Sequence, residues 1–153
     1  MMKPQLFAPR TKADVKNLPK GKLKIKNMRA PNKPVGAFWT STWDGTGSRW
    51  TDWVSGSMPD WKQNKGILME VRSNAKVYII SNRKDYEELY KKYPAKTEHS
   101  MFNPLDWEAI SKDYDGVWVK NPYAHDDLYG WDVESTSWFN MKVLKPVKVV
   151  DVK

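Results

Sequence analysis

The sequence predicts an α+β fold: a single domain over residues 1–153, built on a split, mostly antiparallel β-sheet with a few short helices. Three observations lead to this prediction. Short segments of β-branched and aromatic residues outnumber the helical segments, and the two kinds do not alternate regularly. No linker, internal repeat or low-complexity block divides the chain. A chain of 153 residues can bury one core but is too short for two comfortable domains.

The predicted strands differ in how much of each is expected to be buried. Residues 22–28 (KLKIKNM) alternate lysine with apolar residues, which indicates a half-exposed strand. The last strand, over residues 145–153, offers Val147, Val149 and Val150 for burial. The other predicted strands cover residues 5–10, 37–43, 66–72, 75–81, 116–120 and 132–140.

Short helices are predicted between these strands. The clearest one spans residues 82–94, where three tyrosines and Leu89 form one apolar stripe and Pro94 ends the helix. The other predicted helices cover residues 11–19, a short stretch after Ser48, and residues 103–115.

Positive charge is concentrated near the N-terminus. Residues 1–36 hold ten lysines and arginines against one acid, Asp14, whereas the rest of the chain is nearly neutral. Such a segment can contact a phosphate-rich partner. The alternative is a solvated edge strand whose lysines prevent sheets from pairing edge to edge. The residues that would make the contact are Lys22, Lys24, Lys26 and Arg29.

The composition excludes several chemistries. The chain has no cysteine, so it forms no disulfide and no thiolate metal site. His99 and His125 lack metal-ligand spacing, and DGTGS (44–48) lacks the lysine and the length of a phosphate-binding loop. No apolar run reaches the roughly 18 residues that span a membrane, and no signal-peptide hydrophobic region is present. We therefore expect a cytoplasmic protein with no metal and no membrane contact.

Two carboxylates stand at the start of the predicted strand 132–140. Asp132 and Glu134 are two residues apart, so in a strand both side chains point to the same face. Asp132 can alternatively end the preceding loop, which leaves Glu134 alone at the strand start. An acidic cluster beside a long aromatic loop suits acid–base catalysis or stabilisation of a cation. A solvated hairpin turn is the plain alternative.

A run of hydroxyl side chains lies in the predicted strand 37–43. Alternation sends Thr40 and Thr42 to one face of the sheet and Ser41 to the other. Buried hydroxyls need hydrogen-bond partners, and a carboxylate on a neighbouring strand is an obvious one.

The chain has nine tryptophans, and most of them must lie in the core because aromatic side chains bury the most area. Several, however, stand in segments that read as loops, where partly exposed aromatics could line a pocket. Trp50 and Trp53 would share a helix face, for which core packing is the plain alternative.

In their order along the chain, the segments LFAPR, WTST, SRWTDW, YDGVWV and WDVESTSWFN resemble the mono-ADP-ribosyltransferase superfamily, notably its small bacterial and phage members. That family places an arginine on its first strand and a Ser-Thr-Ser-like segment on a second. A Glu/Gln-x-Glu motif follows on a later strand, after a loop that selects the substrate. The chain departs from this pattern in its Thr-Ser-Thr order and in Asp132, which leaves the type of acceptor open.

The resemblance implies catalytic roles for three residues. Glu134 would be the catalytic glutamate, which orients the ribose hydroxyl on the nicotinamide side and stabilises an oxocarbenium-like transition state. Asp132 would receive or orient the acceptor. Ser41 would support Glu134.

The resemblance also implies a site for NAD, which would be a substrate. Arg10, or its rival Arg29, would bind the phosphate or ribose of the dinucleotide. Thr40 or Thr42 would lie close to the bound dinucleotide. The aromatic residues that could flank the nicotinamide or the acceptor are Trp50, Trp53 and Tyr123.

An enzyme of this type would be a monomer that transfers ADP-ribose to a nucleic acid or a host protein. Its setting would be the cytoplasm of a bacterial or phage-infected cell. The residues leave open a non-enzymatic module that binds nucleic acid through the basic segment and the interleaved aromatics. A phage protein that inhibits a host factor by surface contact alone is a third reading.

Overall fold

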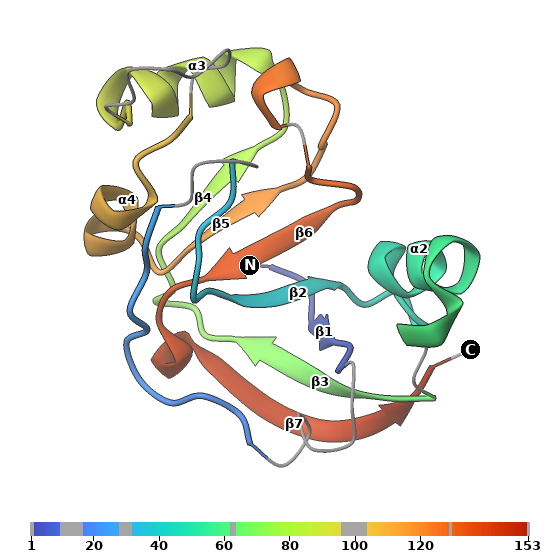
Figure 1. The fold of residues 1–153 in the computed structure, drawn as a ribbon. Coiled ribbons are helices and arrows are strands. Elements are labelled where there is room, and N and C mark those ends of the chain that lie inside the picture. The colour runs from blue at the N-terminus through green and yellow to red at the C-terminus, as the bar shows by residue number, and fades with distance from the viewer. Residues whose placement is uncertain are drawn as a thin grey trace.

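The computed structural model describes residues 2–9, 17–27, 32–61, 64–95, 104–128 and 130–152. Its centre is a seven-stranded sheet in the order β4-β5-β6-β2-β1-β3-β7 (Figure 1). The β4–β5 pair is parallel and the other neighbouring pairs are antiparallel. The α+β prediction is therefore confirmed. The strands are β1 (Gln5–Phe7), β2 (Phe38–Thr42), β3 (Lys65–Val71), β4 (Val77–Ile80), β5 (Gly116–Val119), β6 (Ser135–Trp138) and β7 (Leu144–Asp151).

The sheet is continuous, and this corrects one prediction. Every strand is hydrogen-bonded to its neighbour from β4 to β7, so the expected division of the sheet into two parts is wrong. The link between the two halves is β2, which pairs with β1 on one side and with β6 on the other.

Two predicted strand features also differ in the structure. Residues 22–27 form only isolated bridges, from Lys22 to Asn140 and from Lys26 to Val35, and no strand. In β7, Val147 and Val149 are 52% and 55% exposed rather than buried. This strand stands at the edge of the sheet and pairs with β3 alone, so side chains on its outer part face solvent.

Three α-helices are described: α2 (Arg49–Ser57), α3 (Arg83–Lys92) and α4 (Trp107–Asp113). Ser48 caps α2 and Asn82 caps α3, each in a reciprocal capping box. The predicted helices at these places are confirmed. Short 3₁₀ turns follow at residues 59–61, 126–128 and 141–143. The predicted helix over residues 11–19 lies largely outside the described residues.

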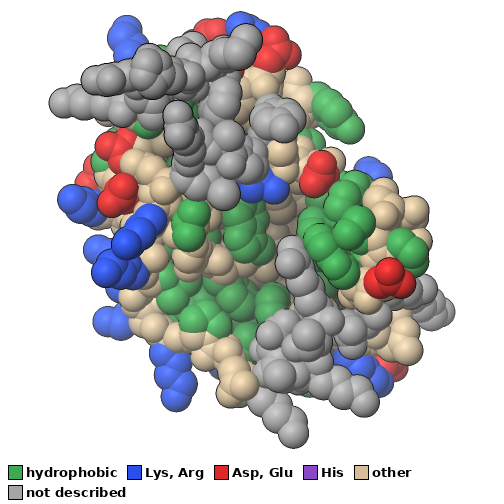
Figure 2. All heavy atoms as spheres, in the orientation of Figure 1, with side chains coloured by type: hydrophobic (Ala, Val, Ile, Leu, Met, Phe, Trp, Pro, Cys, Tyr) green, Lys and Arg blue, Asp and Glu red, His purple; other side chains and the backbone are tan. Residues whose placement is uncertain are grey.

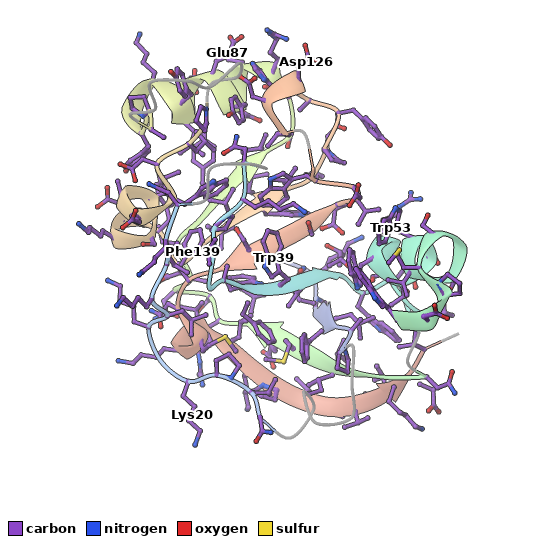
Figure 3. The ribbon with its side chains drawn as sticks, in the orientation of Figure 1. Lys20, Trp39, Trp53, Glu87, Asp126 and Phe139 are labelled. Carbon is purple, nitrogen blue, oxygen red and sulfur yellow. The ribbon has the colours of Figure 1, made fainter. Side chains whose placement is uncertain are left out.

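Side chains alternate between the two faces of the sheet, and each face has its own core. One core packs between the sheet and α3 and α4, and it includes Val117, Val119 and the labelled Phe139 (Figure 3). The other core includes Phe38, which β2 sends to the opposite face. Residues next to each other in one strand therefore belong to different environments.

Asn32 is a polar hub in the first of these cores and is 1% exposed. Its amide donates to the Tyr86 hydroxyl (2.7 Å) and to the Asp127 carbonyl (2.9 Å). Its side-chain oxygen accepts from the backbone N–H of Leu105 (3.0 Å) and from the indole of Trp107 (3.1 Å). One side chain thus joins α3, α4 and the loop before β6, with its hydrogen-bonding capacity fully used.

We predict that Asn32→Ala lowers the free energy of unfolding by about 3 kcal/mol or more, because it leaves several buried groups without partners. Urea denaturation followed by circular dichroism measures this loss. Asn74→Ala, in an exposed turn, is the matched control and should change the stability by less than about 0.5 kcal/mol. Equal effects of the two substitutions would contradict the role of Asn32.

Candidate functional site

The strands that carry the predicted site residues are neighbours in the sheet. β6 pairs with β2, and β2 pairs with β1, in both cases antiparallel. The registers place Thr40 opposite Thr136 and Gln5 opposite Thr42. The start of β1, the end of β2 and the residues before β6 therefore meet at one place.

Glu134 lies at this place, half-buried and one residue before β6. Its Oε1 accepts a hydrogen bond from the backbone N–H of Thr42 (3.0 Å). Its Oε2 accepts from the Thr42 hydroxyl (3.0 Å) and from the indole N–H of Trp118 in β5 (2.6 Å). Hydrogen bonds to an ionised carboxylate are about twice as strong as neutral ones, so these donors hold the carboxylate firmly in position.

The Thr42 hydroxyl is the last link in a longer hydrogen-bond chain. The Trp138 indole donates to the Thr40 hydroxyl (2.8 Å), which donates to the Gln5 side-chain carbonyl (2.8 Å). The Gln5 amide donates to the Thr42 hydroxyl (3.3 Å), which in turn donates to Glu134. An indole can only donate and an ionised carboxylate can only accept, so every link has one direction.

Glu134 and Thr42 line a cavity of about 910 Å³, which we call the carboxylate cavity. Its walls combine apolar side chains of β3 to β5, such as Val71 and Ile79, with a ring of charged groups. Cations outnumber carboxylates in that ring. The cationic residues are Lys3, Arg49, Arg72 and Lys120, and the carboxylates are Glu134 and Asp44.

A tight turn after β2 positions two of these charged groups. The Asp44 carboxylate accepts hydrogen bonds from the backbone N–H groups of Thr46 and Gly47, both at 2.8 Å. These two bonds lower the pKa of the Asp44 carboxyl below its ordinary value. Gly45, at φ +104, supplies the left-handed conformation that the turn requires. The turn leads directly into α2, whose first residue is Arg49.

A second cavity, of about 510 Å³, lies on the opposite face of the sheet. We call it the tryptophan cavity, because Trp39, Trp50 and Trp131 line it. Figure 2 shows this side of the molecule, with apolar side chains gathered over the middle of the sheet and on α2. The other lining residues used below are Lys33, Ser41 and Asp132.

The two predicted carboxylates are not on one face. Glu134 lines the carboxylate cavity and Asp132 lines the tryptophan cavity. The prediction assumed an extended strand from residue 132, but residues 131–134 are irregular and β6 begins only at Ser135. Alternation therefore does not apply to this pair, and the expectation of a shared face is wrong. The alternative holds, in which Asp132 belongs to the preceding loop and Glu134 stands alone near the start of the strand.

Ser41 does not support Glu134. It is 1% exposed and lines the tryptophan cavity, and within the described part of the chain its hydroxyl has no hydrogen-bond partner. The alternation predicted for residues 40–42 is confirmed, because Thr40 and Thr42 both join the chain that ends at Glu134. The hydroxyl that supports Glu134 is that of Thr42. Thr40 is buried and forms an earlier link of the same hydrogen-bond chain.

The three aromatic residues predicted for the site also lie in different places in the structure. Trp50 lines the tryptophan cavity and stacks on Trp53 with a centroid distance of 5.1 Å. Trp53 lines neither cavity and packs in an aromatic cluster with Trp61 (Figure 3). Tyr123 is 89% exposed and lines neither cavity. Only Trp50 of these three therefore faces a site.

None of the predicted cationic residues that the structure describes is placed in the carboxylate cavity. Arg10 and Arg29 lie outside the described residues. Lys22, Lys24 and Lys26 are exposed, away from the carboxylate cavity.

Sequence reasoning missed Gln5, Trp118 and the arginines of the carboxylate cavity. Arg49 and Arg72 occupy ordinary surface positions at the start of α2 and just after β3. One available signal was the period of two in β5, which places Trp118 on the face opposite Val117 and Val119. No feature of the sequence near Trp118 indicated that its side chain contacts Glu134.

Within the described part of the chain, no group of three or more His, Asp or Glu side chains could hold a metal ion. His125 stacks on Tyr86 with a centroid distance of 4.3 Å and accepts a hydrogen bond from the backbone N–H of Asp127 (3.0 Å). No helix among the same residues is long and apolar enough to cross a membrane.

Comparisons of this chain with protein-family models, with curated proteins and with solved structures gave no significant match.

We predict that Asp44→Asn lowers stability at neutral pH and that the deficit shrinks as the pH falls below about 4. The pKa of Asp44 is lowered in the folded protein, so its ionised form stabilises the fold above the unfolded pKa. That contribution is lost as the pH falls through the folded pKa. Thermal unfolding at several pH values tests this, and a deficit that stays constant under acid would contradict it.

Proposed function

We propose that the chain is an NAD-dependent ADP-ribosyltransferase that uses Glu134 as its catalytic carboxylate. One observation carries the proposal: three donors fix this carboxylate in the wall of a cavity that also presents four cationic side chains. The resemblance of the sequence to the mono-ADP-ribosyltransferase superfamily points to the same glutamate. The adjacency of β1, β2 and β6 supports it, because these strands carry the matching segments.

The reaction breaks the bond between the nicotinamide nitrogen and the ribose carbon, and nicotinamide leaves with the electron pair. Positive charge then develops on the ribose. A nucleophilic atom of the acceptor bonds to that carbon and gives up a proton, which completes the transfer. Glu134 would stabilise the developing cation, and its fixed position avoids the cost of reorienting a carboxylate during the reaction.

The cations of the carboxylate cavity suit the pyrophosphate of NAD. Arg49 and Arg72 can each present a guanidinium fork to phosphate oxygens, and Lys3 and Lys120 add point charges. Apolar wall residues such as Ile79 offer a surface for a flat ring. The cavity therefore complements both the charged and the aromatic parts of a dinucleotide.

The proposal reassigns two roles implied by the resemblance. Thr42 takes the role of Ser41, because it is the hydroxyl that contacts Glu134. Lys3, just before β1, takes the role of the first-strand cation, since β1 meets Glu134 at its N-terminal end. Asp132 has no part in breaking the NAD bond. The acceptor would be a macromolecule in the cytoplasm of a bacterial or phage-infected cell.

We predict that Glu134→Gln lowers NAD consumption by about 100-fold or more, because it removes the charge that stabilises the ribosyl cation. The measurement is the release of nicotinamide from NAD, with and without cell lysate as a source of acceptor. Thr42→Val should lower the same rate by about 10-fold, since it removes one of the three donors that hold the carboxylate.

The matched control is Asp132→Asn. Asp132 is two residues from Glu134 in the sequence but lines the tryptophan cavity. The variant should leave nicotinamide release within about twofold of the parent chain. Thermal unfolding of every variant checks that each one folds. The proposal fails if the parent chain consumes no NAD under either condition, or if Glu134→Gln consumes it at the parent rate.

A further inference from the structure

We propose that the tryptophan cavity binds one unstacked base of a single-stranded nucleic acid, while the neighbouring lysines contact the phosphates of that strand. This site lies on the face of the sheet opposite Glu134 and does not depend on the proposed reaction with NAD. Three observations support it: the rigid aromatic walls, an unpaired buried hydroxyl, and the position of the basic segment.

Three tryptophans stand among the lining residues of the cavity, and each packs against another aromatic ring. Trp39, the second residue of β2 (labelled in Figure 3), meets Trp131 edge to face with a centroid distance of 5.0 Å. Trp50, on α2, is held by its stack on Trp53. Both Trp39 and Trp50 remain partly exposed. Stacking on rings that are already fixed costs little conformational entropy, and every nucleobase has a flat face that can stack.

Ser41, which is 1% exposed, is among the residues that line the cavity, and its buried hydroxyl has no hydrogen-bond partner among the described residues. Leaving a buried hydroxyl unpaired costs free energy, and native proteins rarely do so without a reason. The edge of a base carries both donors and acceptors, so it can supply the missing hydrogen bond. Asp132, also in the lining, can accept from an exocyclic amine.

The basic segment lies directly beside this cavity. Lys26 and Val35 exchange two backbone hydrogen bonds, of 3.0 and 2.9 Å, and Val35 lines the cavity. Lys24 and Lys26 are both exposed there, and the ammonium group of Lys33 lies 5.8 Å from the centroid of the Trp39 ring. Lysine and arginine side chains follow this edge of the molecule in Figure 2.

The combination of tryptophans and nearby lysines favours a single-stranded nucleic acid as the ligand over a free base or an apolar molecule. A row of cations continuing from an aromatic cavity matches a chain of phosphates that continues from a stacked base. In a duplex the bases stay stacked inside the double helix, so only its phosphates could contact the protein, through the lysines. The site should therefore distinguish single from double strands.

The test is the binding of a fluorescein-labelled oligodeoxycytidylate of about twelve nucleotides, followed by fluorescence anisotropy. Cytosine offers an exocyclic amine to Asp132. We expect Trp50→Ala to weaken binding roughly 5- to 100-fold, and Ser41→Ala roughly 2- to 10-fold. Because the Ser41 hydroxyl has no partner among the residues that the structure describes, Ser41→Ala should not lower the melting temperature.

Thr136→Val is the matched control for Ser41→Ala. It also removes a buried hydroxyl without a partner, but Thr136 lines neither cavity. It should therefore leave binding unchanged. Replacing Lys24 and Lys26 together by glutamine should reduce the slope of log K against log salt by about two. The pair Lys145→Gln and Lys148→Gln on β7 removes the same charge elsewhere and should change that slope less.

Two results would overturn the proposal. One is binding that Trp50→Ala and Ser41→Ala leave at the parent level, which would place the base outside the cavity. The other is equal affinity for a duplex of the same length, which would reduce the interaction to phosphate contact alone. Glu134→Gln should bind the oligonucleotide like the parent chain, so a failure of the NAD proposal can be recognised separately.

Discussion

The carboxylate cavity depends on one constraint: the hydrogen-bond chain that crosses β6, β2 and β1 and ends on Glu134. Each link satisfies a polar group that the sheet would otherwise bury unpaired, so the chain stabilises the fold and positions the carboxylate at once. Its direction is set by its ends, an indole that can only donate and a carboxylate that can only accept. The indole of Trp118 adds a second, independent donor from β5. A carboxylate tied to two neighbouring strands can reorient only by breaking these hydrogen bonds.

The alternation of side chains along β2 divides the molecule into two chemically different faces. Thr40 and Thr42 belong to the polar chain, whereas Trp39 and Ser41 line the tryptophan cavity. These four residues of β2 thus form part of two sites, and each contacts the side chains that neighbouring strands place on the same face. α2 contributes to both, since Arg49 lines one cavity and Trp50 the other. A ligand at one site and a ligand at the other would meet the same strand from opposite sides.

Much of the fold follows from local sequence pattern. The strand over residues 37–43, the capped helix after Ser48 and the helix over residues 82–94 were predictable because period and capping residues are local signals. The shared face of Thr40 and Thr42 was predictable for the same reason, since side chains in a strand alternate with a period of two. The separation of Asp132 from Glu134 was one of two alternatives that the sequence left open, because it depends on where β6 begins. The partners Gln5, Trp118 and Asn32 were beyond reach, since each acts on residues far away in the chain.

The most direct test of the central claim is a crystal structure of the Glu134→Gln variant with NAD. Our account predicts that the nicotinamide ribose lies within hydrogen-bonding distance of residue 134, with the pyrophosphate against Arg49 or Arg72. NAD bound in the tryptophan cavity instead, or a carboxylate cavity that stays empty at saturating NAD, would contradict it.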